Sequence, residues 1–589
     1  MAVATILLAA TAGSASAAVL TVTTAADVVN GDTSTPARLR ANPGPDGISL
    51  REAILAVHGA PGPHVISFAP MLAGRVIRPA TGFTIHQRFV TIAGFYGVNG
   101  SPAITIDAQA AFPILFTVRA SDVRLSRLRI VNVRFERFAV SVRTGLWFGE
   151  PGPNQITNLR VDGNVFENPP SMASTGLAIS IGMEADTTGT RIADVTIAGN
   201  TFRGFRGVAD ADFGQEAVHI QPAGTNNVIE RVVIYRNLFD DCSFGVELVA
   251  ANAQNSQVRR VHIVGNTFRM NQQPVNLDHI GTDGRPSTSG NLIADVEIAG
   301  NVFHDNRGPD VVLLGGLTNA TGNAVLRTRI VNNLMTGNTV YGGVSLVGGR
   351  EGSSSNQVHD VSIVNNTIVD NVGGGLDVNA NLSGGVGNTV TGVVVRNSLF
   401  WANTKDFFGV SPAQVDHSLT AQAGFAGMNG NVSGDPLFVN AAAGNFRLRS
   451  GSPAIDTGSS SGAPRRDLNC LSRVDDPGTP NSGAGAGRFY DIGAFEFRGG
   501  TRDCAAHVTV VAQGGGMVQS HPDLVACAST CLATIPAGRR LVLTARPAPG
   551  FVFAGWAGEC SGRSDCALTV VTDVRVVARF ISVASPLAE

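Results

Sequence analysis

The chain is poor in charged residues and in polar aromatic residues. Only 15% of its 589 residues are Asp, Glu, Lys or Arg, the net charge is −2, and Lys405 is the only lysine. Because 43 basic residues face 45 acidic ones, the sequence predicts no basic surface for nucleic acid. With four Tyr and three Trp, the chain also has few aromatic rings on which sugars could stack.

Long apolar runs are confined to the N-terminus. Residues 1–18 form such a run and end near Ala15, Ser16 and Ala17, small residues typical of a secretory cleavage site. We therefore predict a signal peptide, although the usual basic start is missing; a buried first strand is the alternative. No later run of 18 apolar residues occurs, so we expect no transmembrane segment and a secreted, extracellular or cell-surface location in a bacterium.

A sustained 3.6-residue apolar period is also absent, which excludes helical solenoids. What is present is a short phrase such as VTIAGNTF that returns every 29 to 37 residues. Aliphatic residues stand five and three positions before its Asn, and a large apolar residue stands two after it. This alternation predicts a strand, a bend at Asn and a second inward side chain. The asparagines of the phrase are Asn164, Asn200, Asn237, Asn266, Asn301, Asn333, Asn366 and Asn397.

A second alternation, such as EAVHIQP from Glu216 or FGVELVA from Phe244, follows each phrase. Two short strands and several turns per repeat predict an all-β parallel β-helix solenoid, in which successive turns stack about 4.8 Å apart. The eight asparagines would then form a structural ladder whose amides hydrogen-bond along the stack. A β-sandwich built from hairpins is the alternative.

The repeat also predicts the domain organisation. We expect an N-terminal cap and first coils in residues 19–115, with a short helix in SLREAIL that Ser49 caps. The parallel β-helix with its C-terminal closing region would occupy residues 116–500. Residues 501–589 would form a small β-rich module.

Five of the seven cysteines lie near the C-terminus. In a small exported β module, close cysteine pairs predict disulfides, which we assign as Cys527–Cys531 and Cys560–Cys566. A zinc site is the alternative, although no His lies close by. Cys242 is expected to be a buried thiol, and the pairing of Cys470 and Cys504 stays open.

These phrases resemble the repeats of right-handed parallel β-helix (pectin-lyase-like) proteins. SLREAIL resembles the CSLREA motif of exported bacterial β-helix proteins, with Ile48 in place of its Cys. DPLFVN, SPAIDTG and DIGAFEF resemble the C-terminal signature of the same proteins, and FAGWAGECSG is similar to bacterial modules related to the internalin B-repeat. The resemblance implies a right-handed solenoid and export, but it leaves the activity open, because this fold carries many functions.

Alternate residues of the second strand should point outward and meet on neighbouring turns. This places His219 next to Glu247, and Asp278 one turn further, which makes these three the candidate catalytic residues. The candidate substrate-binding residues around them are Gln221, Asn276, His279 and Arg285. We predict no cofactor; calcium at Asp210, Asp212 and Glu216 is conceivable by chemistry, but no specific metal motif supports it.

Two functions fit these observations. The first is a monomeric structural or adhesive protein that presents loops to a polysaccharide or a cell-surface partner. The second is a polysaccharide lyase or glycoside hydrolase that acts in a groove on the β-helix face. The sequence favours the first, because it lacks the Asp-Asp, Gly-His-Gly and Arg-Ile-Lys patterns of the family's hydrolases and the Arg-x-Pro-x-x-Arg pattern of its pectate lyases. Whether the protein is an enzyme stays open.

Overall fold

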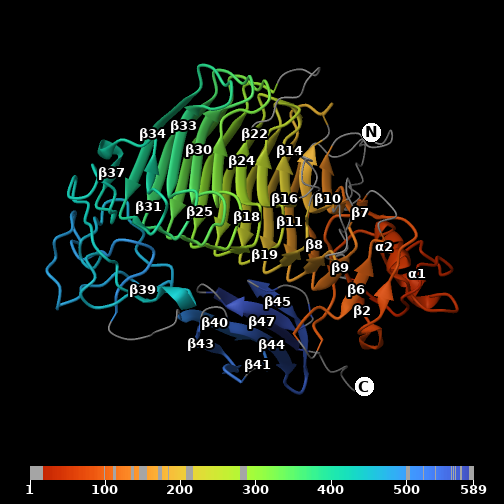
Figure 1. Cartoon of the computed structure of the whole chain (residues 1–589). Coiled ribbons are helices and arrows are strands. Elements are labelled where there is room, and N and C mark those ends of the chain that lie inside the picture. The colour runs from red at the N-terminus through yellow and green to blue at the C-terminus, as the bar shows by residue number, and fades with distance from the viewer. Residues whose placement is uncertain are drawn as a thin grey trace, which may run out of the picture. The chain divides into compact units, whose positions relative to one another are not determined.

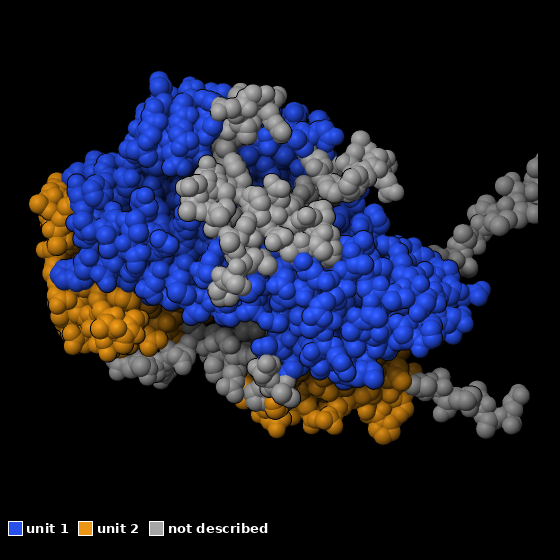
Figure 2. All heavy atoms as spheres, turned by 45° about the vertical axis from the view of Figure 1, so that its right-hand side comes forward, with its two compact units in different colours: residues 1–363, 368–395, 400–414 blue, residues 364–367, 396–399, 415–589 orange. Residues whose placement is uncertain are grey.

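The computed structural model describes residues 18–97, 100–109, 114–133, 138–144, 155–169, 176–183, 185–206, 216–278, 288–498, 505–521, 523–536, 539–558, 560, 563, 565–570 and 574–582. The chain divides into two compact units, which Figure 2 distinguishes by colour. Unit 1 comprises residues 1–363, 368–395 and 400–414, and unit 2 comprises residues 364–367, 396–399 and 415–589. No helix of the described residues has the length and hydropathy needed to cross a membrane.

Three parallel sheets build a β-solenoid, as Figure 1 shows. Each turn of the chain adds one strand to each sheet, so the strands of one sheet come from successive repeats. Sheet A contains β1 (Ala18–Val22), β2 (His64–Phe68), β5 (Val90–Ala93), β8 (Val123–Ser126), β11 (Gln155–Asp162), β14 (Arg191–Ala198), β18 (Val228–Tyr235), β22 (Gln257–Val264), β25 (Leu292–Ala299), β28 (Ala324–Val331), β31 (Gln357–Val364) and β34 (Thr389–Arg396).

The other two sheets have eleven strands each. Sheet B contains β3 (Val76–Ile77), β6 (Ile104–Asp107), β9 (Leu128–Val131), β12 (Val165–Glu167), β15 (Thr201–Arg203), β19 (Leu238–Asp240), β23 (Thr267–Arg269), β26 (Val302–His304), β29 (Leu334–Thr336), β32 (Thr367–Val369) and β35 (Leu399–Trp401). Sheet C contains β4 (Phe83–Ile85), β7 (Ile114–Val118), β10 (Phe138–Thr144), β13 (Leu177–Met183), β16 (Glu216–Gln221), β20 (Phe244–Val249), β24 (Gln273–Asp278), β27 (Val311–Leu314), β30 (Val344–Gly349), β33 (Leu376–Asn381) and β36 (Phe407–Phe408). The predicted parallel β-helix fold is confirmed.

The repeat phrase forms the strands of sheet A, the bend after it and the strands of sheet B. Its alternating aliphatic residues point inward, and like residues of neighbouring turns pair in register. Val195 pairs with Val232, and Val232 pairs with Val261, all at most 1% exposed. β-Branched side chains pack well on such a pleated, half-buried surface, which explains why these positions are occupied by Val and Ile.

The phrase asparagines form a buried ladder inside the bend. From Asn164 to Asn301, each one donates from its backbone N and its Nδ2 to the Oδ1 of the next asparagine, over distances of 2.8–3.1 Å. Each Nδ2 also donates to a strand carbonyl, such as Asn266 to Ile234. The ladder therefore satisfies backbone groups that the bend would otherwise leave buried without partners.

The structure corrects two predictions: the position of the bend within the repeat phrase, and the assignment of Asn397 to the ladder. The left-handed residue of the bend is not the ladder asparagine but the residue before it, such as Gly265 (φ 63°) or Asn365 (φ 54°). Asn397 (φ 50°) occupies this preceding position, and its Nδ2 donates to Asn365 Oδ1. Ser398 holds the ladder position instead, because the backbone N of Asn366 donates to its Oγ. Assigning Asn397 to the ladder was therefore wrong by one residue.

Two further columns of polar residues line the other bends. One lies ten residues before the ladder and runs through Thr190, Asn227, Ser256, Asn291, Asn323, Asn356 and Asn388. The other follows sheet B; its hydrogen bonds join Cys242, Asn271 and Asn306, and then Asn338, Asn371 and Asn403. Cys242 is a buried thiol, as predicted, and burial raises its pKa to about 12. Nearly every bend thus uses one buried amide or hydroxyl per turn.

Stacked phenylalanines fill the interior beside sheet B. The rings of Phe166, Phe202, Phe239, Phe268 and Phe303 are buried, with centroids 4.6–5.1 Å apart and planes within 12° of parallel. These residues stand two after each ladder asparagine, as the alternation predicted. The spacing of the rings equals the spacing of the turns, so the parallel fold itself sets the stacking.

A short helix follows β1, as SLREAIL predicted. Helix α2 (Leu50–His58) begins after Ser49, whose side chain accepts a hydrogen bond from the backbone N of Glu52. Glu52 completes a capping box, since its carboxylate accepts from the N of Ser49, and it also accepts from the N of Asn30 and Gly31. The remaining helices are α1 (Pro36–Ala41) and the 3₁₀ helices η1 (Pro70–Leu72), η2 (Pro412–Gln414) and η3 (Ala441–Ala443).

In unit 2, the DIGAFEF segment and the residue after SPAIDTG bond to bend residues of the last turns. Asn365 Nδ2 donates to the carbonyl of Asp491, the N of Ser459 donates to Asn397 Oδ1, and the N of Ala494 donates to Thr367 Oγ1. These bonds join segments more than 60 residues apart in the sequence. This part of unit 2 also contains β37 (Val415–Asp416), β38 (Phe438–Asn440) and β39 (Asn445–Leu448).

The C-terminal module contains two four-stranded sheets. One contains β40 (Ala505–Gln513), β43 (Thr530–Pro536), β45 (Phe551–Gly558) and β47 (Val574–Ser582), and the other contains β41 (Gly516–His521), β42 (Ala526–Cys527), β44 (Arg539–Pro547) and β46 (Cys566–Val570). Trp556 is 6% exposed in the core between them.

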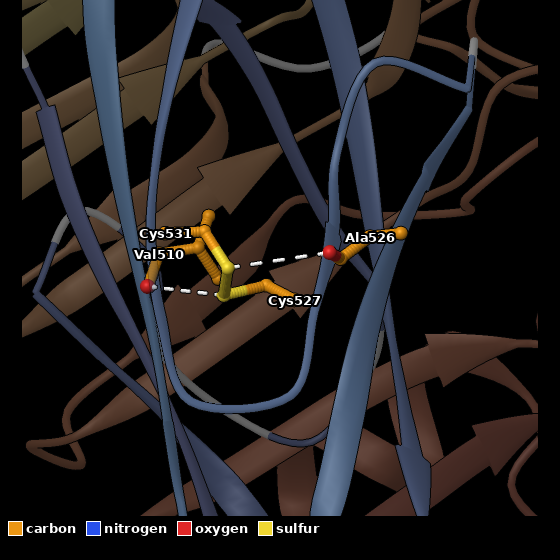
Figure 3. The surroundings of a disulfide bond; sticks show 4 residues. All are labelled: Val510, Ala526, Cys527 and Cys531. Carbon is orange, nitrogen blue, oxygen red and sulfur yellow. Dashed lines mark hydrogen bonds between the residues drawn. A yellow bond between two sulfur atoms is a disulfide. The ribbon is translucent and has the colours of Figure 1, made fainter.

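Both predicted disulfides are present in this module, so the zinc alternative is wrong. They join Cys527 to Cys531 and Cys560 to Cys566. Figure 3 shows the first bond, with the sulfur of Cys527 lying 3.5 Å from the carbonyl oxygen of Val510. Cys504 lies outside the described residues, so the pairing of Cys470 and Cys504 stays open.

Candidate functional site

Sheet C carries a column of outward-facing residues on consecutive turns. Its register pairs follow the predicted order without a slip: Ser180, His219, Glu247, Asn276, Val312, Ser345 and Asp377. The alternation of the second strand was therefore sufficient to place these residues, because a period of two allows only one outward set. The column brings polar groups from repeats up to about 200 residues apart onto one face.

His219 and Glu247 form a hydrogen-bonded pair in this column. His219 Nδ1 lies 2.9 Å from Glu247 Oε2, and His219 Nε2 lies 3.3 Å from Gln221 Oε1. Gln221 is held in turn, since its Nε2 donates to the carbonyl of Ala251 at 3.0 Å. The side chains of His219 and Glu247 are only 12% and 2% exposed. A buried carboxylate that orients an imidazole is an arrangement suited to proton transfer.

Glu216 is a third member of this cluster. The sequence grouped it with Asp210 and Asp212 as a conceivable calcium ligand, and the structure places it at the start of β16. Its carboxylate is 1% exposed and lies 4.0 Å from His219 Nδ1. The ligand-type atoms of Glu216, His219 and Glu247 all lie within 4.8 Å of one another.

Of the remaining predicted site residues, Asn276 adjoins the cluster of Glu216, His219 and Glu247, and the others do not or lie outside the described residues. Asn276 pairs with Glu247 on the next turn and is 4% exposed, so it adjoins the cluster as expected. Asp278 pairs with Val249, which puts its backbone in the neighbouring outward column; its side chain is outside the described part of the chain. His279, Arg285, Asp210 and Asp212 also lie outside it, so their predicted roles stay predictions.

A groove continues along sheet C from Asn276. Its volume is about 650 Å³, and β24, β27, β30 and β33 form its floor. The polar groups along it include Gln273, Asn276, Arg307, Ser345, Arg350 and Asp377. Tyr341, whose residue surface is 58% exposed, stands at its side, and a smaller cavity of about 220 Å³ continues from Ser345 and Asp377 toward Phe408.

Burial raises the pKa of Asp377 above its ordinary value. A carboxyl group with a raised pKa in a groove can release or accept a proton closer to neutral pH, which is one mark of a functional residue. The turns between His219 and Asp377 separate them by roughly 24 Å, so these residues do not share one reaction centre.

The sequence did not predict the groove walls. Arg307, Tyr341 and Arg350 lie on loops between the strands, where no alternation places a side chain. The floor residues Val312, Leu314 and Val347 provide the apolar surface between the polar walls. Apolar floors with a few polar groups are typical of ligand sites.

Charged groups on the other two sheets are mostly paired with each other. On sheet A, burial alone would raise the pKa of Glu230, but hydrogen bonds from Arg191 and Arg259 outweigh it and lower the pKa to about 2. On sheet B, Asp240 bonds to both Arg203 and Arg269. The arginines and carboxylates of these two sheets neutralise one another, and sheet C is therefore the better candidate for a binding face.

Comparison with known proteins identifies the C-terminal module. Residues 506–584 match the family model described as a divergent InlB B-repeat domain, which confirms the resemblance predicted from FAGWAGECSG. No protein with a curated description matches the sequence.

Several solved structures resemble the chain at low similarity. The A-module of mannuronan C-5 epimerase AlgE6 from Azotobacter vinelandii aligns with a TM-score of 0.36 and 13% identity, over 65% of this chain and 95% of that one. Pectate lyase Pel9A aligns with a TM-score of 0.30 and 14% identity, over 82% of this chain and 97% of that one. A PL6 alginate lyase in complex with a trisaccharide aligns with a TM-score of 0.31 and 11% identity, over 69% of this chain and 90% of that one. The strand pairing establishes the solenoid, and likeness of this degree says nothing about activity.

Proposed function

We propose that the protein is an exported β-helix protein that binds a polysaccharide chain in the groove of sheet C. The observation that carries this proposal is the groove itself, an elongated hollow of about 650 Å³ lined by polar side chains from four consecutive turns. Four strands spaced by one turn span about 14 Å, which suits an extended chain of sugars better than a small metabolite. The two disulfides of the C-terminal module support an oxidising, extracellular location.

The wall residues support acidic sugars as ligands. Arg307 and Arg350 stand against a single acidic lining residue, Asp377. Guanidinium groups form bidentate hydrogen bonds with carboxylates, so Arg307 or Arg350 could bind the carboxylate of a uronic acid. Tyr341 offers an exposed ring on which a sugar face could pack.

Replacing Tyr341 with Ala is expected to weaken polysaccharide binding about tenfold or more, which is the loss of one aromatic contact worth about 1.4 kcal/mol. Tyr341→Phe should keep most of the affinity, because it keeps the ring. Arg307→Ala should weaken acidic polysaccharides more than neutral ones. Isothermal titration with a panel of acidic and neutral polysaccharides measures each effect.

Matched controls come from the far part of unit 1. Phe89 is an exposed aromatic residue and Arg75 an exposed arginine, and neither lines the groove. Phe89→Ala and Arg75→Ala should bind as the unchanged protein does. No binding to any polysaccharide of the panel by the folded protein would contradict the proposal, and so would equal losses in the groove and control variants.

The second candidate function is cleavage of the bound polysaccharide, as a lyase or hydrolase. It is favoured by the 2.9 Å contact between His219 and Glu247, where Glu247 lies one turn from the groove residue Asn276. If the pair transfers a proton in the reaction, His219→Ala and Glu247→Gln should each lower kcat by about 100-fold or more. Release of reducing ends or of unsaturated ends from acidic polysaccharides measures it. His262→Ala, which removes an exposed His–Glu pair on sheet A, should leave the rate unchanged.

A further inference from the structure

We infer that Glu216, His219 and Glu247 form a site for a divalent transition-metal ion, with Zn²⁺ as the best fit. The three side chains converge from two neighbouring turns of sheet C and present one imidazole nitrogen and two carboxylate oxygens within 4.8 Å of one another. The inference is independent of polysaccharide binding by Arg307 and Tyr341; it shares His219 and Glu247 with the cleavage candidate, but its test measures zinc binding and not the release of sugar ends.

The distances fit a metal of this class. Zn²⁺ binds imidazole nitrogen and carboxylate oxygen at about 2.0–2.2 Å in tetrahedral geometry, so two of its ligand atoms lie about 3.4 Å apart. His219 Nδ1 lies 2.9 Å from Glu247 Oε2 and 4.0 Å from Glu216 Oε1. Small rotations of the two carboxylates therefore suffice to place all three atoms around one ion.

Burial adds an electrostatic reason. Both carboxylates are nearly inaccessible to water, at 1% and 2% side-chain exposure, and buried charges are costly unless they are neutralised or bonded. A divalent cation would bind all three ligand atoms at once and offset the cost of burying the two carboxylates. The imidazole favours zinc and other first-row transition metals, which bind nitrogen well. It disfavours calcium, which prefers oxygen ligands.

Neighbouring contacts orient the ligands as metal sites require. The opposite nitrogen of His219, Nε2, lies 3.3 Å from Gln221 Oε1, and Gln221 is fixed by the carbonyl of Ala251. Such an outer partner holds the tautomer that leaves Nδ1 able to bind a metal. A metal ion on His219 Nδ1 requires this nitrogen to carry no proton, so any proton held between it and Glu247 Oε2 leaves to solvent on binding.

Titration of the metal-free full-length protein with ZnCl₂ tests the site. We expect one equivalent of Zn²⁺ to bind and to raise the melting temperature, because the ion binds only the folded state. Glu216→Gln, His219→Gln and Glu247→Gln should each lower the affinity by about 100-fold or more, since even outer-shell changes lower it 10- to 100-fold. MnCl₂ should bind more weakly than ZnCl₂, and CaCl₂ should give no shift.

The exposed pair His262 and Glu297 provides the matched control. It repeats the His–Glu contact at 3.1 Å on sheet A, and no third ligand lies beside it among the residues that the structure describes. His262→Gln and Glu297→Gln should therefore leave the zinc stoichiometry and affinity unchanged. The inference is overturned if the folded protein binds no zinc, if the three site variants bind it as well as the control variants, or if calcium binds and zinc does not. Far-ultraviolet circular dichroism of each variant separates loss of the site from loss of the fold.

Discussion

Replacement of Asn266 with Ala is expected to lower the free energy of unfolding by about 2–6 kcal/mol. The Oδ1 of Asn266 accepts from the N and the Nδ2 of Asn237, and its Nδ2 donates to the carbonyl of Ile234 and to Asn301 Oδ1. Alanine leaves the N–H of Asn237 and the carbonyl of Ile234 buried without these partners. Each such group costs about 1–3 kcal/mol. Urea unfolding followed by circular dichroism measures the change.

Two variants sharpen this test. Asn266→Asp keeps the shape and the acceptor oxygen but cannot donate to Ile234 or Asn301, so it should destabilise at least as much as alanine. Gln257→Ala changes a partly exposed amide on the same turn and should cost less than about 0.5 kcal/mol. A small effect of Asn266→Ala, close to that of Gln257→Ala, would contradict the role of the ladder.

The ladder was predictable because it repeats, and repetition turns a weak local pattern into a strong one. A single IAGN segment says little, but several such segments followed by a large apolar residue require one common structure. The same pattern predicted the stacked phenylalanines. It failed at Asn397, where RNS replaces the usual order: the asparagine there occupies the left-handed position, and Ser398 takes over the hydrogen bond. The two positions are adjacent and both favour Asn, so composition alone could not separate them.

The candidate site was predictable only as far as the strands extend. Alternation placed His219, Glu247 and Asn276 in one column, and the register pairs agree. It could not place Arg307 or Tyr341, because loops follow no period and their side chains reach the groove through tertiary structure. Glu216 was grouped with Asp210 and Asp212 and not with His219, because it stands at the boundary where the strand begins.

The sequence did not predict that the charged residues of unit 2 converge in its interior. Asp456, Asp467, Asp491 and Glu496 are at most 5% exposed and share the interior with Arg473. In the sequence they are separated by glycine-rich loops, and no period relates them. Their convergence depends on contacts such as the bond from the N of Asp456 to Asp491 Oδ1.

Replacement of Arg473 with Met is expected to lower the free energy of unfolding of unit 2 by about 3–5 kcal/mol near neutral pH. Its side chain is 1% exposed and pairs with Glu496, which is fully buried, at 2.8 Å. Methionine fills a similar volume but leaves the carboxylate buried without its cation. Urea unfolding of the full-length protein measures the loss. The double variant Arg473→Met with Glu496→Gln should recover much of it, because both charges are then gone.

The loss should shrink on acidification. Burial raises the pKa of Asp467, Asp491 and Glu496, and it raises the pKa of Asp456 to about 6. For an acid whose folded pKa is raised, the folded state binds more protons than the unfolded state. The resulting stability is fully present below the unfolded pKa, near 4, and is lost as the pH rises through the folded value.

Unit 2 of the unchanged protein should therefore be more stable near pH 5 than near pH 7.5, and Arg473→Met should widen this difference, because Glu496 without its guanidinium binds its proton more tightly still. The lowered pKa values of Glu230 and Asp240 in unit 1 do not interfere, since these groups lose their contribution only at more acidic pH. Equal losses of stability for Arg473→Met at both pH values would show that the arginine acts through packing and not through charge.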